Sequence, residues 1–123
     1  MKKININIIN QAHFIGCWNL ENNDLCQNII QLFENNKTMQ NKGAMSGSYN
    51  PKKKKTTDIT INPKDLENPK FNVLKKYIGE LHKCYLDYQN QWPFLKSVFN
   101  EVHIGRFNIQ KYSPGDHFAE LHS

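Results

Sequence analysis

A regular apolar stripe between residues 71 and 88 places the firmest limit on the fold. The stripe repeats at spacings of three and four residues and consists of Phe71, Leu74, Ile78, Leu81, Tyr85 and Tyr88. This spacing predicts one amphipathic helix, which begins after the N-cap Asn68 with Pro69 in its first turn and ends near residues 91–92, before Pro93. Packing of a single helix on a sheet explains such a stripe, and pairing with a partner helix is the alternative.

A second, shorter helix is predicted upstream. Its apolar positions at helical spacing are Leu25, Ile29, Leu32 and Phe33. Asp24, with Gln27 three residues later, resembles a capping box. We expect about three turns, ending near residues 35–36.

The remaining patterned segments indicate β-strands. Isoleucines alternate with asparagines from residue 4 to residue 8, and this pattern continues irregularly through residues 14–18. Residues 57–61 read Thr-Asp-Ile-Thr-Ile and are closed by Asn-Pro, which predicts a short strand. Residues 102–112 are rich in Val, Ile, Phe and Tyr and predict another strand.

A turn is predicted at residues 113–116, where Pro114 and Gly115 occupy the central positions of a type II turn. We expect a second strand, residues 117–123, to fold back after it. Residues two apart share a face of a strand. This alternation groups Asn108, Gln110 and Tyr112 on one face. In the last segment it groups Phe118, Glu120 and His122.

Length and composition allow one domain with a modest core. The chain has 123 residues, of which 38% are hydrophobic and 11% aromatic, enough for a packed chain rather than a disordered one.

The net charge of the chain is +5, and Lys52 to Lys55 supply four of those charges. We expect these lysines in a solvated, flexible basic loop, about residues 38–56, with an anion site as the alternative. Nucleic-acid binding is not expected, because no aromatic residues interleave with the lysines.

Cysteine usage and hydropathy indicate a cytoplasmic protein. Cys17, Cys26 and Cys84 are odd in number and widely separated, which is typical of reduced thiols. Asparagines interrupt the apolar run after Met1, so we do not expect a signal peptide. No stretch approaches the roughly 20 apolar residues needed to span a bilayer, so we expect no membrane segment.

Histidines are the candidate metal ligands, and they occur at positions 13, 82, 103, 117 and 122. A lone histidine is most often structural or solvated, and we assign His13, His82 and His103 to that class. His117 and His122 are five residues apart, which is not a recognised zinc spacing in a strand. No cysteine lies near them in the sequence, so zinc is not expected.

The setting of His122 distinguishes it from the other histidines. Residues 107–123 read Phe-Asn-Ile-Gln-Lys-Tyr-Ser-Pro-Gly-Asp-His-Phe-Ala-Glu-Leu-His-Ser. This segment resembles the strand, Tyr-x-Pro-Gly turn and His-x-Asp/Glu segment of iron(II)/2-oxoglutarate dioxygenases related to prolyl 4-hydroxylases. Residues 14–18, 57–63 and 88–95 also look like the N-terminal portion of microbial and viral members of that group. The resemblance covers most of the chain, but only residues 107–123 carry a chemical motif.

The resemblance implies an α+β fold in which N-terminal helices pack on the first strands of an incomplete double-stranded β-helix, or jelly roll. It implies Fe(II) held by two histidines and a carboxylate, with 2-oxoglutarate as co-substrate, O2 as oxidant and ascorbate as a further candidate. His122 would be the first iron ligand. Tyr112 would bind 2-oxoglutarate or position the substrate, and a tyrosine packed in the core is the alternative. The substrate would be a C–H bond of a protein, a peptide or a small molecule.

In this reading the carboxylate ligand is expected at position 124, one residue after Ser123. The resemblance therefore treats residues 1–123 as a single partial domain of an enzyme, inactive by itself. The alternative is a non-catalytic binding or assembly module, whose contact surface would be the Lys52–Lys55 loop or the Phe71–Tyr88 helix face.

Overall fold

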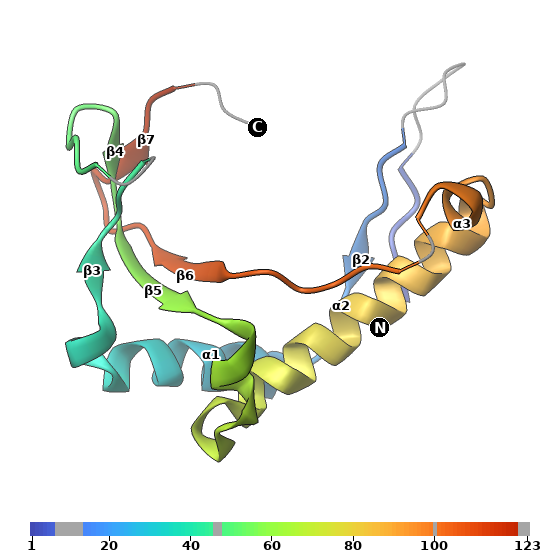
Figure 1. Ribbon diagram of the computed structural model, residues 1–123, viewed down its shortest axis with the longest axis horizontal. Coiled ribbons are helices and arrows are strands. Elements are labelled where there is room, and N and C mark those ends of the chain that lie inside the picture. The colour runs from blue at the N-terminus through green and yellow to red at the C-terminus, as the bar shows by residue number, and fades with distance from the viewer. Residues whose placement is uncertain (7–13, 46–47, 100, 121–123) are drawn as a thin grey trace.

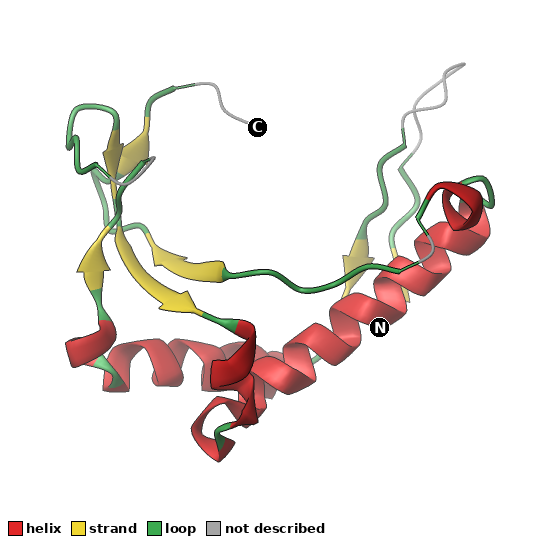
Figure 2. Ribbon diagram, viewed as in Figure 1, coloured by secondary structure: helices red, strands yellow, loops and turns green. Residues whose placement is uncertain are grey.

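The computed structural model describes residues 1–6, 14–45, 48–99 and 101–120, which have an α+β fold. The helices are α1 (Asn23–Asn35), α2 (Asn72–Gln91) and α3 (Leu95–Val98), with 3-10 turns η1 (Lys37–Met39), η2 (Pro63–Glu67) and η3 (Pro69–Phe71). The strands are β1 (Lys2–Lys3), β2 (Trp18–Asn19), β3 (Asn41–Lys42), β4 (Lys54–Lys55), β5 (Thr57–Ile61), β6 (Phe107–Lys111) and β7 (His117–Phe118). Figures 1 and 2 show β3, β5 and β6 on one side of α1, with α2 continuing past the end of this sheet.

Strand β5 is the centre of the larger sheet. It pairs antiparallel with β3 on one side and with β6 on the other, where Ile59 lies opposite Ile109. Strand β1 pairs with β2, and β4 pairs with β7, in two smaller antiparallel sheets. In the described ranges these sheets do not close into a barrel.

The core lies between one face of the larger sheet and the two long helices. Ile59 and Ile61 of β5 are buried beside Phe33 of α1 and beside Phe71 and Leu74 at the start of α2. Because side chains alternate along a strand, one face of β5 supplies both isoleucines. Burial of these apolar side chains holds the sheet on the helices.

The opposite face of this sheet is polar. On it Asp58 lies opposite Gln110, and Thr60 lies opposite Asn108. Nε2 of Gln110 donates to Asp58 at 3.2 Å, and the hydroxyl of Thr60 donates to Oδ1 of Asn108 at 2.8 Å. One apolar and one polar face are typical of an antiparallel sheet that covers a core on one side only.

Helix α2 contacts two different parts of the molecule. Its first turns join the core, whereas its C-terminal half lies beside the β1–β2 pair (Figure 1). Nε1 of Trp18 donates to Asp87 at 2.7 Å, and the hydroxyl of Tyr88 donates to the carbonyl of Phe14 at 2.6 Å. The apolar stripe is therefore buried mainly at its N-terminal end, and Leu81 is 52% exposed. No helix in the described ranges has the length and apolarity that a membrane span requires.

Both predicted helices and the strand at residues 57–61 are present. However, α2 begins at Asn72 rather than directly after Asn68, because Pro69–Phe71 form the separate 3-10 turn η3 that Asn68 caps. The N-cap of α1 differs from the prediction, because the side chain of Asn22, rather than that of Asp24, accepts the N–H of Leu25 at 3.0 Å. The strand predicted for residues 4–8 is absent at residues 4–6, and its remainder lies outside the described residues. The strand predicted for residues 102–112 is confined to β6.

The segment expected as a flexible basic loop, about residues 38–56, contains regular structure in η1, β3 and β4. Lys54, expected in solvent, is only 4% exposed, so the solvated reading is wrong for this residue. The expectation for the last strand is corrected as well. After the turn, β7 pairs with β4 rather than folding back on β6.

A carboxylate ties α1 to the edge of the sheet. Glu34 accepts hydrogen bonds from Lys111 of β6 and from Lys37, and these bonds lower its pKa from 4.5 to about 2. A carboxyl whose pKa is lower in the folded chain stabilises the fold above its unfolded pKa, and this contribution is lost as the pH falls towards the folded pKa. We therefore expect the free energy of unfolding to fall less steeply in Glu34→Gln than in the wild type between pH 4.5 and about 2.

Urea denaturation at several pH values across this window gives, for each protein, the slope of the free energy of unfolding against pH. The matched control is Glu67→Gln, which changes an exposed glutamate at the end of η2. A slope for Glu34→Gln equal to that of the wild type would contradict the role assigned to the Glu34 carboxylate.

Candidate functional site

Tyr112 and the turn after it form the described part of the candidate site. Tyr112 directly follows β6, two residues beyond Gln110 on the polar face of the sheet, and it is 47% exposed rather than packed in the core. The predicted turn is present: Gly115 has a φ of +86°, and the N–H of Asp116 donates to the carbonyl of Ser113 at 2.8 Å. Glycine is needed here because other residues disfavour this left-handed conformation.

The carboxylate of Asp116 closes the turn and attaches it to β4. Its Oδ2 accepts the N–H of Ser113 at 2.9 Å, and its Oδ1 lies 3.1 Å from Nζ of Lys55. The backbone hydrogen bond from Ser113, followed by the bond from Lys55, lowers the pKa of Asp116. The charged form that holds the turn is therefore favoured.

The segment after the turn lies along residues 52–55, which we call the lysine strip. Strand β7 pairs with β4, and the N–H of Ala119 donates to the carbonyl of Lys53 at 2.7 Å. Nζ of Lys53 lies 2.7 Å from a carboxylate oxygen of Glu120. Successive side chains of the strip therefore point to opposite sides. Lys53 and Lys55 bind the carboxylates of Glu120 and Asp116, and Lys54 is buried against Asp58 on the polar face of the larger sheet.

A polar cluster lies at the inner side of the lysine strip, formed by the buried Lys54, Thr56 and Asp58 together with Gln110. The carboxylate of Asp58 accepts hydrogen bonds from Nζ of Lys54 at 2.9 Å, from the hydroxyl of Thr56 at 2.7 Å and from Gln110 at 3.2 Å. Nζ of Lys54 also lies 5.7 Å from the centre of the Phe118 ring, within reach of a cation–π contact. The cluster therefore joins β4, β5, β6 and β7.

Gly43 leaves the space in which this cluster packs. It follows β3, is buried, and donates its N–H to the carbonyl of Thr56 at 3.0 Å. A Cβ at this position would lie 1.8 Å from Oγ1 of Thr56 and 3.1 Å from Oδ2 of Asp58. Glycine therefore fits here without displacing the cluster, and a larger residue does not.

The expected iron ligand, His122, lies outside the described residues. Within the described ranges, no group of three or more His, Cys, Asp or Glu side chains lies close enough together to hold a metal ion. His117 belongs to β7, and its Nε2 lies 3.4 Å from the carbonyl of Lys52. Of the motif seen in the sequence, the structure thus places Tyr112, the turn and β7. The strand predicted for residues 117–123 is shorter than expected, because β7 ends at Phe118 and residues 119 and 120 are not in a strand.

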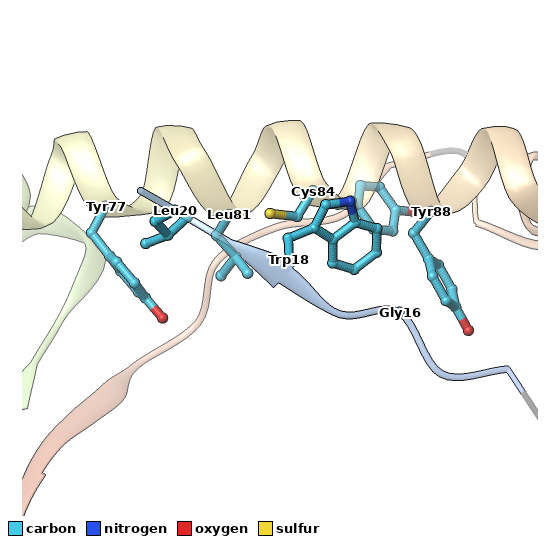
Figure 3. Close-up of a pocket in the computed structure, with 8 residues that line it drawn as sticks. Gly16, Trp18, Leu20, Tyr77, Leu81, Cys84 and Tyr88 are labelled. Carbon is cyan, nitrogen blue, oxygen red and sulfur yellow. The ribbon is translucent and has the colours of Figure 1, made fainter. Parts of the chain in front are cut away.

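A second candidate site is an aromatic groove along the C-terminal half of α2 (Figure 3). Its volume is about 450 Å³, and its lining residues are Gly16, Trp18, Leu20, Tyr77, Leu81, Cys84, Tyr85 and Tyr88. The polar atoms of Trp18 and Tyr88 already bind Asp87 and the Phe14 carbonyl. Burial raises the pKa of the Cys84 thiol, which disfavours the reactive thiolate. The groove therefore presents an apolar surface rather than a catalytic group.

The sequence-based interpretation missed the polar cluster. Its signal is the spacing of Lys54, Thr56 and Asp58, which are two residues apart and so share one face of a strand. The run of four lysines hid this alternation, because a charge run is usually solvated. Gln110 was placed on the correct face, but its partner Asp58 is distant in the sequence.

Comparisons with known protein families, with curated proteins and with solved structures found no match.

Proposed function

We propose that this chain forms the N-terminal part of an iron(II)/2-oxoglutarate-dependent oxygenase related to prolyl 4-hydroxylases. The enzyme would hydroxylate a C–H bond of a protein, a peptide or a small molecule. The helices and the first strands would belong to a jelly roll, Tyr112 would bind 2-oxoglutarate or position the substrate, and His122 would be an iron ligand. The observation that carries this proposal is the unit formed by β6, the type II turn and β7.

Observed features of this unit support the proposal. Tyr112 is 47% exposed and directly follows β6, whose Gln110 lies on the polar face of the sheet, so a polar co-substrate would reach it without entering the core. Gly115 and Asp116 fix the turn that follows, and the turn leads into a strand rather than a helix. A short, rigid connection of this kind suits a site whose groups come from both sides of a turn.

Metal chemistry sets what else the site needs. Ferrous iron in such enzymes is held by two histidines and one carboxylate, which leave coordination positions for 2-oxoglutarate and oxygen. The described residues do not contain that set. His122 alone would not hold the ion, because affinity depends on several ligands fixed together. The proposal therefore assigns the carboxylate to position 124 and the second histidine to residues outside this sequence.

Under this proposal the 123-residue chain binds Fe(II) no more tightly than a surface histidine does. Anaerobic isothermal titration with ferrous iron measures this affinity, and the matched control is the His122→Ala variant. We expect only weak heats from both proteins. Tight 1:1 binding by the wild type would show that a full ligand set lies within these residues and would contradict the proposed division of the site.

The coding sequence downstream of Ser123 tests the proposal directly. Asp or Glu at position 124, followed later by a histidine and by an Arg or Lys for the far carboxylate of 2-oxoglutarate, favours the oxygenase. A stop codon in that place refutes it and favours the alternative.

The second candidate function is a non-catalytic binding or assembly module. The aromatic groove favours it, because exposed side chains such as Tyr77 and Leu81 would be covered by a partner. The lysine strip is less suited to this role, because Lys53, Lys54 and Lys55 each lie within ion-pair distance of a carboxylate of this chain.

A further inference from the structure

We propose that Lys54 is a positioning residue: through its buried pair with Asp58 it fixes the sheet that carries Tyr112 relative to the strand that follows the turn. The importance of this alignment for 2-oxoglutarate binding rests on the proposed function. The alignment itself follows from contacts among the described residues.

The two groups of strands to be aligned belong to different sheets. Tyr112 follows β6 of the β3–β5–β6 sheet, whereas β7 pairs with β4 in a two-stranded sheet. The turn at residues 113–116 connects the two sheets on one side, and Thr56 alone connects β4 to β5 on the other (Figure 1). The backbone bond from Gly43 to the carbonyl of Thr56 holds β3 at this junction, and the side chains packed there supply further contacts between the two sheets.

The polar cluster occupies that junction. Asp58 of β5 binds Lys54 of β4, the connecting Thr56, and Gln110 of β6 through one carboxylate. Lys54 in turn lies against the ring of Phe118 in β7. A rotation of one sheet against the other would break several of these contacts together.

Lys54 differs from its neighbours in the strip by its burial. The side chains of the Lys53–Glu120 pair are 48% and 41% exposed, so water competes for both ions and this pair constrains little. In the Lys55–Asp116 pair the carboxylate is 9% exposed, but Lys55 is 56% exposed, so this pair attaches the turn to β4 through an ammonium that water can still reach. The side chains of the Lys54–Asp58 pair are 5% and 7% exposed. A buried ion that loses its partner is not rescued by solvent, so this pair tolerates only a narrow range of geometry.

A buried ion pair is a poor way to gain stability, because apolar side chains of similar volume often stabilise a fold as well or better. Its advantage is orientation, since hydrogen bonds to a carboxylate have preferred distances and directions. The close packing of Gly43 against Thr56 and Asp58 restricts the cluster further. These features favour a positioning role over a purely stabilising one.

The test replaces both charges at once, with Lys54→Met and Asp58→Asn in the same 123-residue chain. This double variant leaves no unpaired buried ion, so we expect it to fold. Hydrogen exchange followed by NMR reports separately on Ala119, whose N–H binds the lysine strip, and on the amides of the β5–β6 ladder. We expect exchange at Ala119 to be about tenfold faster and the β5–β6 amides to change by less than about twofold.

A purely stabilising role predicts a different result, in which both sets of amides exchange faster by the same factor. That outcome, or a rate for Ala119 within about twofold of the wild type, would overturn the proposal. The matched control is Lys53→Met with Glu120→Gln, which removes an exposed pair from the same strip and should leave Ala119 within about twofold of the wild type.

A single variant keeps the proposal testable if the double variant does not fold. Phe118→Leu removes the ring beside Lys54 but keeps an apolar side chain, and we expect exchange at Ala119 to be about threefold faster with the β5–β6 ladder unchanged. An unchanged rate at Ala119 in this variant would also overturn the positioning role.

These measurements need no iron, so their outcome can be separated from that of the proposed function. In a protein extended to hold the full ligand set, the double variant should raise the KM for 2-oxoglutarate about tenfold with little change in melting temperature. An extended wild type that binds no iron would refute the proposed function and the link to 2-oxoglutarate. The exchange rates at Ala119 would still decide whether Lys54 orients the segment.

Discussion

Replacing Asp58 with alanine is expected to lower the free energy of unfolding by about 3 to 5 kcal/mol. The substitution removes the acceptor of three hydrogen bonds and leaves the ammonium of Lys54 buried without its counter-charge. Small domains are stable by about 5 to 15 kcal/mol in total, so a loss of this size would unfold a large fraction of the chain. Urea denaturation followed by circular dichroism measures the change.

Two comparisons isolate the buried pair as the cause. Glu80→Ala removes the partner of Lys83, whose side chain is 62% exposed, and should lower the free energy of unfolding far less than Asp58→Ala does. Adding Lys54→Met to Asp58→Ala should recover much of the loss, because the unpaired charge is then gone. A cost for Asp58→Ala as small as that of Glu80→Ala would show that Lys54 is solvated in the folded protein.

Replacing His122 with alanine is expected to abolish 2-oxoglutarate turnover in a protein extended to include the remaining ligands. Loss of a residue that only orients a metal ligand typically costs 10- to 100-fold in affinity or activity, so loss of a ligand should reduce ferrous affinity by about 100-fold or more. Helix content should not change, because the core is formed by α1, α2 and the larger sheet. Consumption of 2-oxoglutarate and anaerobic iron titration measure the two effects.

The matched control for this experiment is His117→Ala. His117 lies in β7 with its ring near the carbonyl of Lys52, and the proposal gives it no ligand role. We expect turnover in this variant to stay within about threefold of the wild type. Retained turnover in His122→Ala, or loss in His117→Ala alone, would show that the ligand assignment is wrong.

Local signals account for the elements that were predicted correctly. Both long helices follow from apolar residues at helical spacing, and the turn follows from Pro114 and Gly115. Each of these features involves residues only a few positions apart, so the sequence contains all the information they need. The exact cap of α1 was missed because Asn22 and Asp24 are both good capping residues and only geometry selects between them.

Strand pairing required information that neighbouring residues do not hold. Strand β7 pairs with β4, more than sixty residues earlier in the sequence. Ion pairs of Lys53 with Glu120 and of Lys55 with Asp116 accompany this pairing. The counter-charge of Lys54 is Asp58, only four residues away, but the residues that enclose the pair, Gln110 and Phe118, are distant in the sequence. The burial of Lys54 was therefore missed. Strand alternation assigned Tyr112 to the face of Gln110, but its 47% exposure depends on how the sheets are arranged, which the sequence does not show.

The sequence by itself therefore determined the two long helices, the central strand and the turn, because these depend on short-range patterns. Only the tertiary structure decided which strands pair, which lysine enters the interior and which surfaces stay open, because those outcomes depend on contacts between residues far apart along the chain.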